Sequence, residues 1–231
     1  MEYGRKQRLI MGVATLVVFC VVVMFATMSA VFVDKSPHWQ KTVLLDAGHG
    51  GRDGGCVGAN GSIEKELNLA YTLEIKRMLE DAGVRVVLTR AQDEALYSPF
   101  ARNKKIDDMQ KRVAIIKRTK PDLYISIHMN STSYTYRQGA QVYYGQVNDS
   151  GKCFAELLAK TYNRLLPNAS PNAKSGDLYI LDQTNYAGVL VECGFLSNAE
   201  EEANLLTKEY RQRVAYATFC GVMLCLGLKT A

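Results

Sequence analysis

Three short apolar runs, each followed directly by a side chain that can titrate or bind a metal, restrict what this chain can fold into. The runs are TVLL, LYISI and GVLV, and they lead to Asp46, His128 and Glu192. Between them lie stretches in which apolar residues recur at helical spacing. The alternation of strands with helices predicts an α/β domain, in which helices cover a sheet.

The other expected elements follow from caps, breakers and periodicity. Ser62 is expected to cap a helix that Gly83 ends. The last helix starts acidic, becomes apolar, and is expected to break near Gly221. The expected helices cover residues 62–81, 108–118, 152–166 and 199–226, the expected strands cover residues 84–88, 141–144 and 178–181, and loops cover residues 90–107 and 167–176.

The first 33 residues differ in kind from the rest of the chain. Three basic residues among the first eight precede an uncharged stretch from Leu9 to Val33. Its length, about 25 residues, can span a bilayer and exceeds the apolar core of a typical signal peptide. The sequence therefore favours an uncleaved transmembrane anchor over a cleavable signal helix, with the N-terminus in the cytoplasm and the rest outside it. Residues 34–41 then form a linker, and residues 42–231 form the domain.

The charge of the chain is mildly basic. The formal net charge is +5, and the basic residues are dispersed along the sequence. Such a surface suits contact with an anionic polymer or a membrane, but it is too weak and too scattered to indicate nucleic-acid binding. The sequence therefore predicts no nucleic-acid partner.

The histidines point to a metal site. The chain has three, and one of them, His38, lies in the expected linker, so both histidines of the domain, His49 and His128, follow apolar runs. Sites in open α/β sheets gather at the carboxyl ends of strands. Two imidazoles and one carboxylate form a common ligand set for catalytic zinc, which leaves a fourth position for water.

Two glutamates compete for the place of the carboxylate ligand. Glu64 and Glu66 both lie in the first turn of the helix expected after the glycine-rich stretch. Residues two apart on a helix point about 200° away from each other, so only one of them should face the metal. Each residue also has a simpler interpretation: a histidine at a strand end can be an ordinary polar residue, and a glutamate in a first turn complements the helix dipole.

The stretch LLDAGHGGRDGG surrounds His49 with five glycines. Glycine lets a backbone turn sharply without a Cβ in the way, so the stretch could aim His49 at a metal. A glycine-rich loop before a helix can also hold phosphate. The G-x-G-x-x-G spacing is absent, and the histidine at the centre favours metal.

Four stretches together resemble the zinc-dependent N-acetylmuramoyl-L-alanine amidases of the Amidase_3 type: LLDAGHGGRDGG, GSIEKELNL, DLYISIHMNS and GVLVECGFLSN. The likeness runs from about Lys41 to the C-terminus. It implies a twisted, mixed, mostly parallel sheet flanked by helices, of the phosphorylase/hydrolase-like kind. It also implies one zinc ion per chain, held by His49, Glu64 and His128, with Glu192 as the catalytic residue.

The implied reaction cleaves the amide between the lactyl group of N-acetylmuramic acid and L-alanine, so the substrate is peptidoglycan. In its architecture, a single domain after an N-terminal anchor without cell-wall-binding repeats, the chain resembles the germination-specific amidases of spore-forming bacteria. Those enzymes act with a polysaccharide deacetylase to form muramic-δ-lactam in the spore cortex, on the forespore or mother-cell side. An accessory activator protein is a further partner to test for.

Three other functions remain open. The first is a vegetative amidase of cell division or wall turnover. The second is a zinc carboxypeptidase acting on the peptide stem, and the third is a non-catalytic wall-binding domain. Loss of a ligand or of the glutamate at position 192 would favour the third, but neither is lost.

Overall fold

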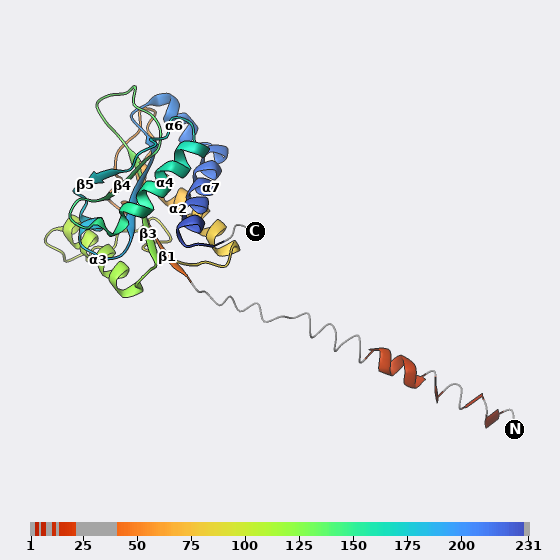
Figure 1. Ribbon diagram of the computed structural model, residues 1–231. Helices are drawn as coiled ribbons and strands as arrows, with labels where there is room; N and C mark the ends of the chain where they lie inside the picture. The colour runs from red at the N-terminus through yellow and green to blue at the C-terminus, as the bar shows by residue number, and fades with distance from the viewer. Residues whose placement is uncertain (1–2, 5, 8–10, 13, 22–40, 229–231) are drawn as a thin grey trace. The chain divides into compact units, whose positions relative to one another are not determined.

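Figure 1 shows the computed structural model of the chain, which describes residues 3–4, 6–7, 11–12, 14–21 and 41–228. The chain divides into two units, Met1–His38 and Trp39–Ala231. The predicted membrane or signal segment at residues 1–33 lies partly outside the described residues, and the predicted linker at 34–41 lies almost wholly outside them. Among the residues that are described, no helix is both long enough and apolar enough to cross a bilayer.

The described part of the second unit is built on a six-stranded sheet with the order β2-β1-β3-β6-β4-β5. Neighbouring strands are parallel, except that β4 runs antiparallel to β6. This confirms the predicted mixed, mostly parallel sheet. The strands are β1 (Thr42–Ala47), β2 (Arg85–Leu88), β3 (Leu123–Asn130), β4 (Gln141–Gly145), β5 (Lys174–Gly176) and β6 (Gly188–Phe195).

Helices pack on both faces of this sheet, as Figure 1 shows. The larger core lies on the face covered by α2 (Glu64–Asp81), α4 (Lys152–Leu165) and α7 (Lys208–Cys225). The smaller core lies on the face covered by α3 (Lys104–Thr119) and the short α5 (Tyr179–Asp182). A 3₁₀ turn, Asp149–Gly151, precedes α4, and α6 (Ala199–Leu205) follows β6.

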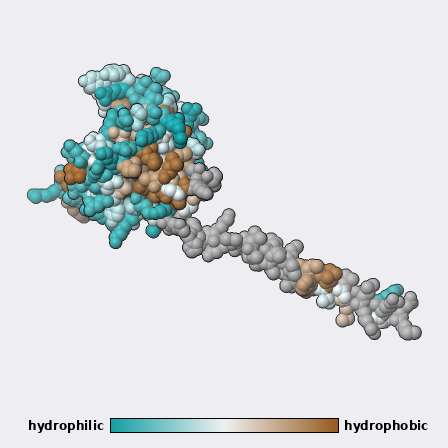
Figure 2. All heavy atoms as spheres, viewed as in Figure 1, coloured by the Kyte–Doolittle hydropathy of each residue, from teal (hydrophilic) through white to brown (hydrophobic). Residues whose placement is uncertain are grey.

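The central strands are apolar on both sides because both faces are covered. In β1, Val43 and Leu45 enter the larger core, whereas Leu44 enters the smaller one. This alternation explains the continuous apolar runs seen in the sequence. Figure 2 shows a mainly hydrophilic surface with hydrophobic side chains gathered on the face where α2, α4 and α7 lie.

Two local predictions were wrong because tertiary contacts decide them. Ser62 does not cap α2; the helix begins at Glu64 after Ile63, which offers no side-chain cap. The Ser62 hydroxyl instead donates to Glu202 in α6. Residues 178–181, expected as a strand, contribute to α5, since four apolar residues do not distinguish a strand from a helix.

The C-terminal helix was predicted as one element with a break at the wrong place. It forms two helices, α6 and α7, and the second begins after Thr207, whose hydroxyl accepts a hydrogen bond from the backbone N–H of Tyr210. Gly221 lies inside α7, where an added Cβ would overlap the Leu158 side chain of α4. This glycine therefore allows two helices to pack closely rather than ending one.

Candidate metal centre

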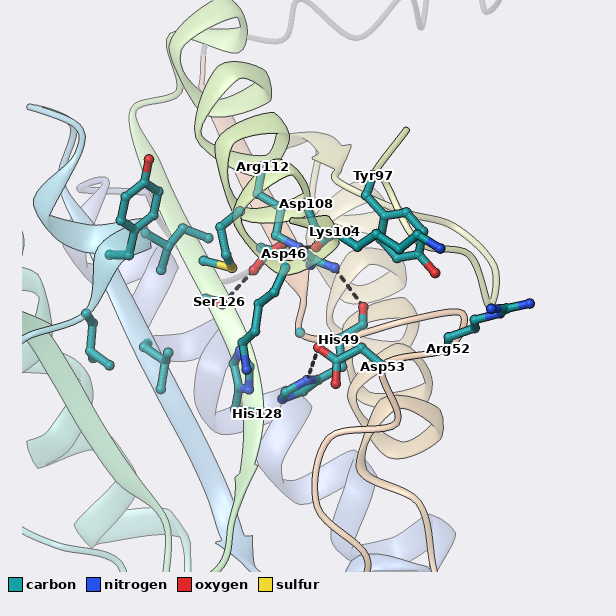
Figure 3. A pocket seen from close by; sticks show the side chains of 17 residues that line it. Asp46, His49, Arg52, Asp53, Tyr97, Lys104, Asp108, Arg112, Ser126 and His128 are labelled. Atoms are coloured by element: carbon teal, nitrogen blue, oxygen red, sulfur yellow. Dashed lines mark hydrogen bonds and ion pairs between the residues drawn. The ribbon is translucent and has the colours of Figure 1, made fainter. Parts of the chain in front are cut away.

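His49, Glu64 and His128 come together at one point, with ligand atoms all within 4.8 Å of one another. Glu64 Oε1 lies 3.2 Å from His49 Nε2 and 2.9 Å from His128 Nδ1. The two imidazole rings meet edge to face, with centroids 5.0 Å apart. Figure 3 shows both rings turned toward the same space. The three residues come from three separate segments: the glycine-rich loop, the start of α2, and β3.

Strands β3 and β6 extend beyond the apolar runs that marked them in the sequence. Strand β3 does not stop at His128 but continues to Asn130, and β6 continues past Glu192 to Phe195. His128 and Glu192 are register partners in the parallel β3–β6 pair. Their side chains therefore leave the sheet on the same face, side by side, near the carboxyl ends of the strands.

The start of α2 resolves the competition between the two glutamates. Glu64 is buried and faces the histidines, whereas Glu66 is exposed. The backbone N–H of Cys56 donates to Glu64 Oε2 at 2.8 Å, and the Asn68 amide donates to Oε1 at 3.2 Å. Burial alone would raise the pKa of Glu64, but its hydrogen bonds and ionic contacts with His128 and His49 outweigh burial and lower it. Glu64 is therefore an ionised carboxylate.

Two glycines of the loop are required by close contacts with these side chains. A Cβ on Gly48 would overlap the ring of His128, and a Cβ on Gly55 would overlap Glu64. Gly55 also has φ of 71°, in the region that glycine tolerates best. His49 itself has φ of 60°, which is uncommon for a residue with a side chain. The surrounding structure must therefore hold the His49 backbone in place.

Two buried arginines hold the backbone around His49 in place. Arg112 of α3 donates to the carbonyl oxygens of Ala47 and His49, each at 2.7 Å. Arg90 donates to the carbonyl oxygens of Ala47 and Gly48, each at 2.9 Å. Both side chains are buried, so the loop carbonyls find strong partners where water is excluded. Neither arginine is predicted from the sequence to belong to the site.

Asp46, at the end of the first apolar run, belongs to this support and not to the ligand group. Its Oδ1 lies 2.7 Å from Arg112 Nη1, and its two oxygens accept hydrogen bonds from the hydroxyls of Thr89 and Ser126, each at 2.6 Å. Complete burial alone would raise the pKa of Asp46, but Arg112 and the two hydroxyls outweigh it and lower the pKa.

The contact between His49 and Asp53 is looser. Asp53 Oδ2 lies 3.0 Å from His49 Nδ1, as drawn in Figure 3, but the carboxylate lies off the ring N–H direction, so Nδ1 makes no hydrogen bond. Burial lowers the pKa of His49, and the contacts with Glu64 and Asp53 outweigh it and raise the pKa. Asp53 therefore helps to raise the pKa of His49, with a smaller effect than that of Glu64.

Glu192 presents an unsatisfied oxygen. Its Oε2 is buried and has no hydrogen-bond partner in the described part of the chain. Burial raises the pKa of Glu192 to about 7, with Glu64 adding to the rise and His128 opposing it. A buried carboxylate without a partner is costly unless it is put to use.

The residues present fit a divalent metal. Two imidazoles and one ionised carboxylate converge, as catalytic zinc sites require. Glu192 is the register partner of His128 in the β3–β6 pair, and its Oε2 has no hydrogen-bond partner in the described part of the chain. The arrangement can bind a cation and still offer a nearby carboxylate for proton transfer.

A cavity of about 490 Å³ opens beside the two histidines. Its floor is the α3/α5 face of the sheet, with Asp46, Ser126 and Leu190, and its walls come from α3, α5 and the glycine-rich loop. Figure 3 looks into this cavity. A bound molecule can therefore reach the candidate metal position from the α3/α5 face of the sheet.

Comparisons with known proteins give a consistent result. The family model described as N-acetylmuramoyl-L-alanine amidase, Amidase_3, matches residues 43–223. The germination-specific N-acetylmuramoyl-L-alanine amidase of Bacillus subtilis (strain 168) is 33% identical over 188 residues, which cover 79% of this chain and 78% of that protein.

Solved structures agree with the sequence matches. The CwlD amidase of Clostridioides difficile, solved in complex with the GerS lipoprotein, is 32% identical with a TM-score of 0.76, covering 81% of this chain and 98% of that one. The catalytic domain of CwlV, an N-acetylmuramoyl-L-alanine amidase from Bacillus (Paenibacillus) polymyxa var. colistinus, is 31% identical with a TM-score of 0.73, covering 82% and 99%.

Proposed function

Because the chain belongs to the Amidase_3 family of N-acetylmuramoyl-L-alanine amidases, we propose that it cleaves peptidoglycan with one zinc ion held by His49, Glu64 and His128, and with Glu192 as the catalytic residue. The observation that carries this proposal is the convergence of the three ligand groups within 4.8 Å. Two imidazoles with one carboxylate favour zinc over magnesium or calcium, which prefer oxygen ligands.

Bound zinc supplies Lewis-acid polarisation of the amide carbonyl and of the attacking water. The remaining chemistry falls to Glu192. Its carboxylate accepts a proton from the attacking water and delivers it to the departing amine nitrogen, so it acts first as a general base and then as a general acid. A pKa of about 7 suits both roles near neutral pH.

The surrounding residues position these groups. Arg112 and Arg90 fix the backbone on either side of His49, and the backbone N–H of Cys56 fixes the Glu64 carboxylate. The glycines leave room for the ligand side chains. These hydrogen bonds thus orient the His49 backbone and the Glu64 carboxylate, two of the groups that would hold the metal.

We further propose that the enzyme acts on the spore cortex. Its reaction would be one step toward the formation of muramic-δ-lactam and toward germination. The likeness to the germination-specific amidase of Bacillus subtilis supports this role. The complex of CwlD with the GerS lipoprotein supports an accessory lipoprotein partner for this chain as well. The enzyme then acts outside the cytoplasm, anchored through the apolar stretch from Leu9 to Val33. A polysaccharide deacetylase would act on the same glycan.

The test combines metal analysis with product identification. The full chain, purified in detergent, is assayed for bound metal and incubated with purified cortex peptidoglycan. Lactyl-bearing muramoyl sugars and intact stem peptides are expected as products, with close to one zinc ion per chain. Released single amino acids would instead identify a carboxypeptidase, and peptidoglycan binding without cleavage would identify a wall-binding domain.

The cortex role has a separate test in the organism. Spores of a deletion strain should lack muramic-δ-lactam, and the wild-type gene should restore it. Normal cortex lactam in the deletion strain would contradict the sporulation role and favour a vegetative amidase of division or wall turnover.

A further inference from the structure

The cavity beside the histidines has a cationic rim that the reaction itself does not use. Arg52, Lys104 and Lys105 line it and are exposed. Lys104 lies over the ring of Tyr97, with Nζ 5.4 Å from the ring centroid. Figure 3 shows Tyr97, Lys104 and Arg52 along one side of the pocket. The cation–π contact holds one ammonium group at this rim.

These cations form no ion pair among the described residues, in contrast to Lys111 and Arg112 in the middle of α3. Farther along α3, Lys111 pairs with Asp107, and Arg112 pairs with Asp46 and Asp108. Lys104 and Lys105, in the first turn of α3, form no ion pair within the described part of the chain.

The remaining acidic residue at the rim, Asp53, forms no ion pair with them, although the charge of Lys105 helps to lower the pKa of its carboxyl. Asp53 is turned to His49, with its Oδ2 3.0 Å from His49 Nδ1. The cavity wall nearer the sheet is apolar, with Met109 and Leu178. The cavity therefore combines an apolar wall with a rim on which three exposed cations outnumber the single acidic residue, Asp53, a pattern suited to a short anionic ligand.

The two sides of the scissile amide differ in charge. The glycan side, with N-acetylated sugars and a lactyl group engaged in the amide, carries no charge. The peptide side carries the free carboxylates of the acidic residues in the stem. A cationic pocket next to the metal position therefore matches the peptide side.

We propose that the cavity between α3 and α5 binds the stem peptide, and that Lys104 and Lys105 recognise a stem carboxylate. This assignment rests on the proposed amidase function, because it places the scissile amide at His49 and His128. The scissile amide then lies beside His49 and His128, and the first peptide residues enter the cavity. The glycan strand remains outside the cavity.

The first experiment compares two small substrates that differ only in charge: N-acetylmuramoyl-L-alanyl-D-glutamate and its diamide. The zinc-loaded full chain is expected to prefer the dicarboxylate by about tenfold in kcat/KM, through KM. The K104M/K105M variant should lose most of that preference, and K104R/K105R should restore it. High salt should weaken the preference of the wild-type enzyme.

Lys117→Met provides the matched control. Lys117 is exposed on the same helix, about 18 Å farther along the axis from Lys105, and it does not line the cavity. This variant should keep the wild-type preference. A K104M/K105M variant that still prefers the dicarboxylate as strongly as the wild type would overturn the proposal.

A second measurement does not depend on catalysis. Calorimetry with free L-alanyl-D-glutamate should show binding to the zinc-loaded wild type that is about tenfold weaker in K104M/K105M. Equal binding would overturn the assignment of the pocket. If the wild type cleaves neither substrate but binds the dipeptide through these lysines, the proposed function fails and the peptide site stands.

Discussion

Arg112 donates a hydrogen bond from Nη2 to the backbone carbonyl of His49, at 2.7 Å. The same guanidinium pairs with Asp46 through Nη1, also at 2.7 Å. One buried side chain thus links the end of β1, the helix α3 and the backbone of a candidate ligand. The stability of the domain and the geometry of the metal site are coupled through it.

Replacing Arg112 by Gln should therefore affect both properties. We expect the free energy of unfolding to fall by about 3–5 kcal/mol, because the buried Asp46 loses its ionic partner. Metal affinity should fall as well, because the His49 carbonyl is released. Urea unfolding and a metal titration measure the two effects. Arg77→Gln, on an exposed face of α2, is the control and should change neither quantity. An Arg112→Gln variant with wild-type stability and wild-type metal affinity would contradict the coupling.

Asp46 should make stability depend on acid pH. Its folded-state pKa lies below the ordinary value of 3.8, so its contribution to stability is fully present above that value. The contribution is lost as the pH falls through the lower folded-state pKa. Asp46→Asn should therefore show a shallower loss of stability below about pH 4 than the wild type. Parallel curves for the two proteins, measured by denaturation in acid buffers, would show that Asp46 is not involved.

The candidate ligands should be needed for metal binding. His49→Ala, Glu64→Ala and His128→Ala should each purify with far less metal than the wild type, because a three-ligand site loses one group. Elemental analysis of the purified proteins measures this loss. Glu66→Ala is the matched control, since this exposed residue lies two positions after Glu64 and points away. A His128 variant that keeps full metal content would remove His128 from the set.

Glu192→Gln should separate metal binding from turnover. The amide keeps the shape of the side chain but cannot accept the proton, so turnover should fall by about 10²–10⁴-fold while metal content stays unchanged. Hydrolysis of a muramoyl peptide, followed by chromatography, measures the rate. Wild-type turnover in this variant would rule out Glu192 as the general base.

The glycine-rich loop should tolerate a methyl group at one position and not at another. Gly48→Ala should weaken metal binding, because the added Cβ overlaps the ring of His128. Gly54→Ala should have a much smaller effect, because its added Cβ would meet only one side-chain atom, Cγ2 of Ile63, at 3.3 Å and not a metal ligand. Metal titrations of both variants make the comparison, and equal effects would show that the loop simply rearranges.

The parts of the fold that could be predicted are those that local sequence encodes. Continuous apolar runs marked β1, β3 and β6, because strands covered on both faces must be apolar. The start of α3 was placed four residues late, since the cap at Asn103, which accepts from the backbone N–H of Ile106, lay inside a polar stretch taken for a loop. The bond of Ser62 to Glu202 joins residues 140 apart, and no local pattern reveals it.

The residues of the candidate site likewise fall into those that the sequence reveals and those that it does not. His49 and His128 were identified from their residue type and their positions after apolar runs, whereas Glu64 was chosen over Glu66, and Glu192 assigned as catalytic, through the resemblance to the amidases. The structure brings His49, Glu64 and His128 together. Arg90 and Arg112 were missed because charged side chains are normally exposed, and nothing local distinguishes these two from surface cations. The four-residue spacing of Asp108 and Arg112 was a weak signal, since such pairs are common on exposed helices.

The two faces of the sheet have different roles in this molecule. The larger core packs against α2, α4 and α7, while the cavity and its lysines belong to the side of α3 and α5. Substitutions on the exposed first turn of α3 can thus alter substrate preference without disturbing the packing that keeps the chain folded. Evolution can adapt such an enzyme to stems of different chemistry by changing one short helical segment, and an engineer can follow the same route.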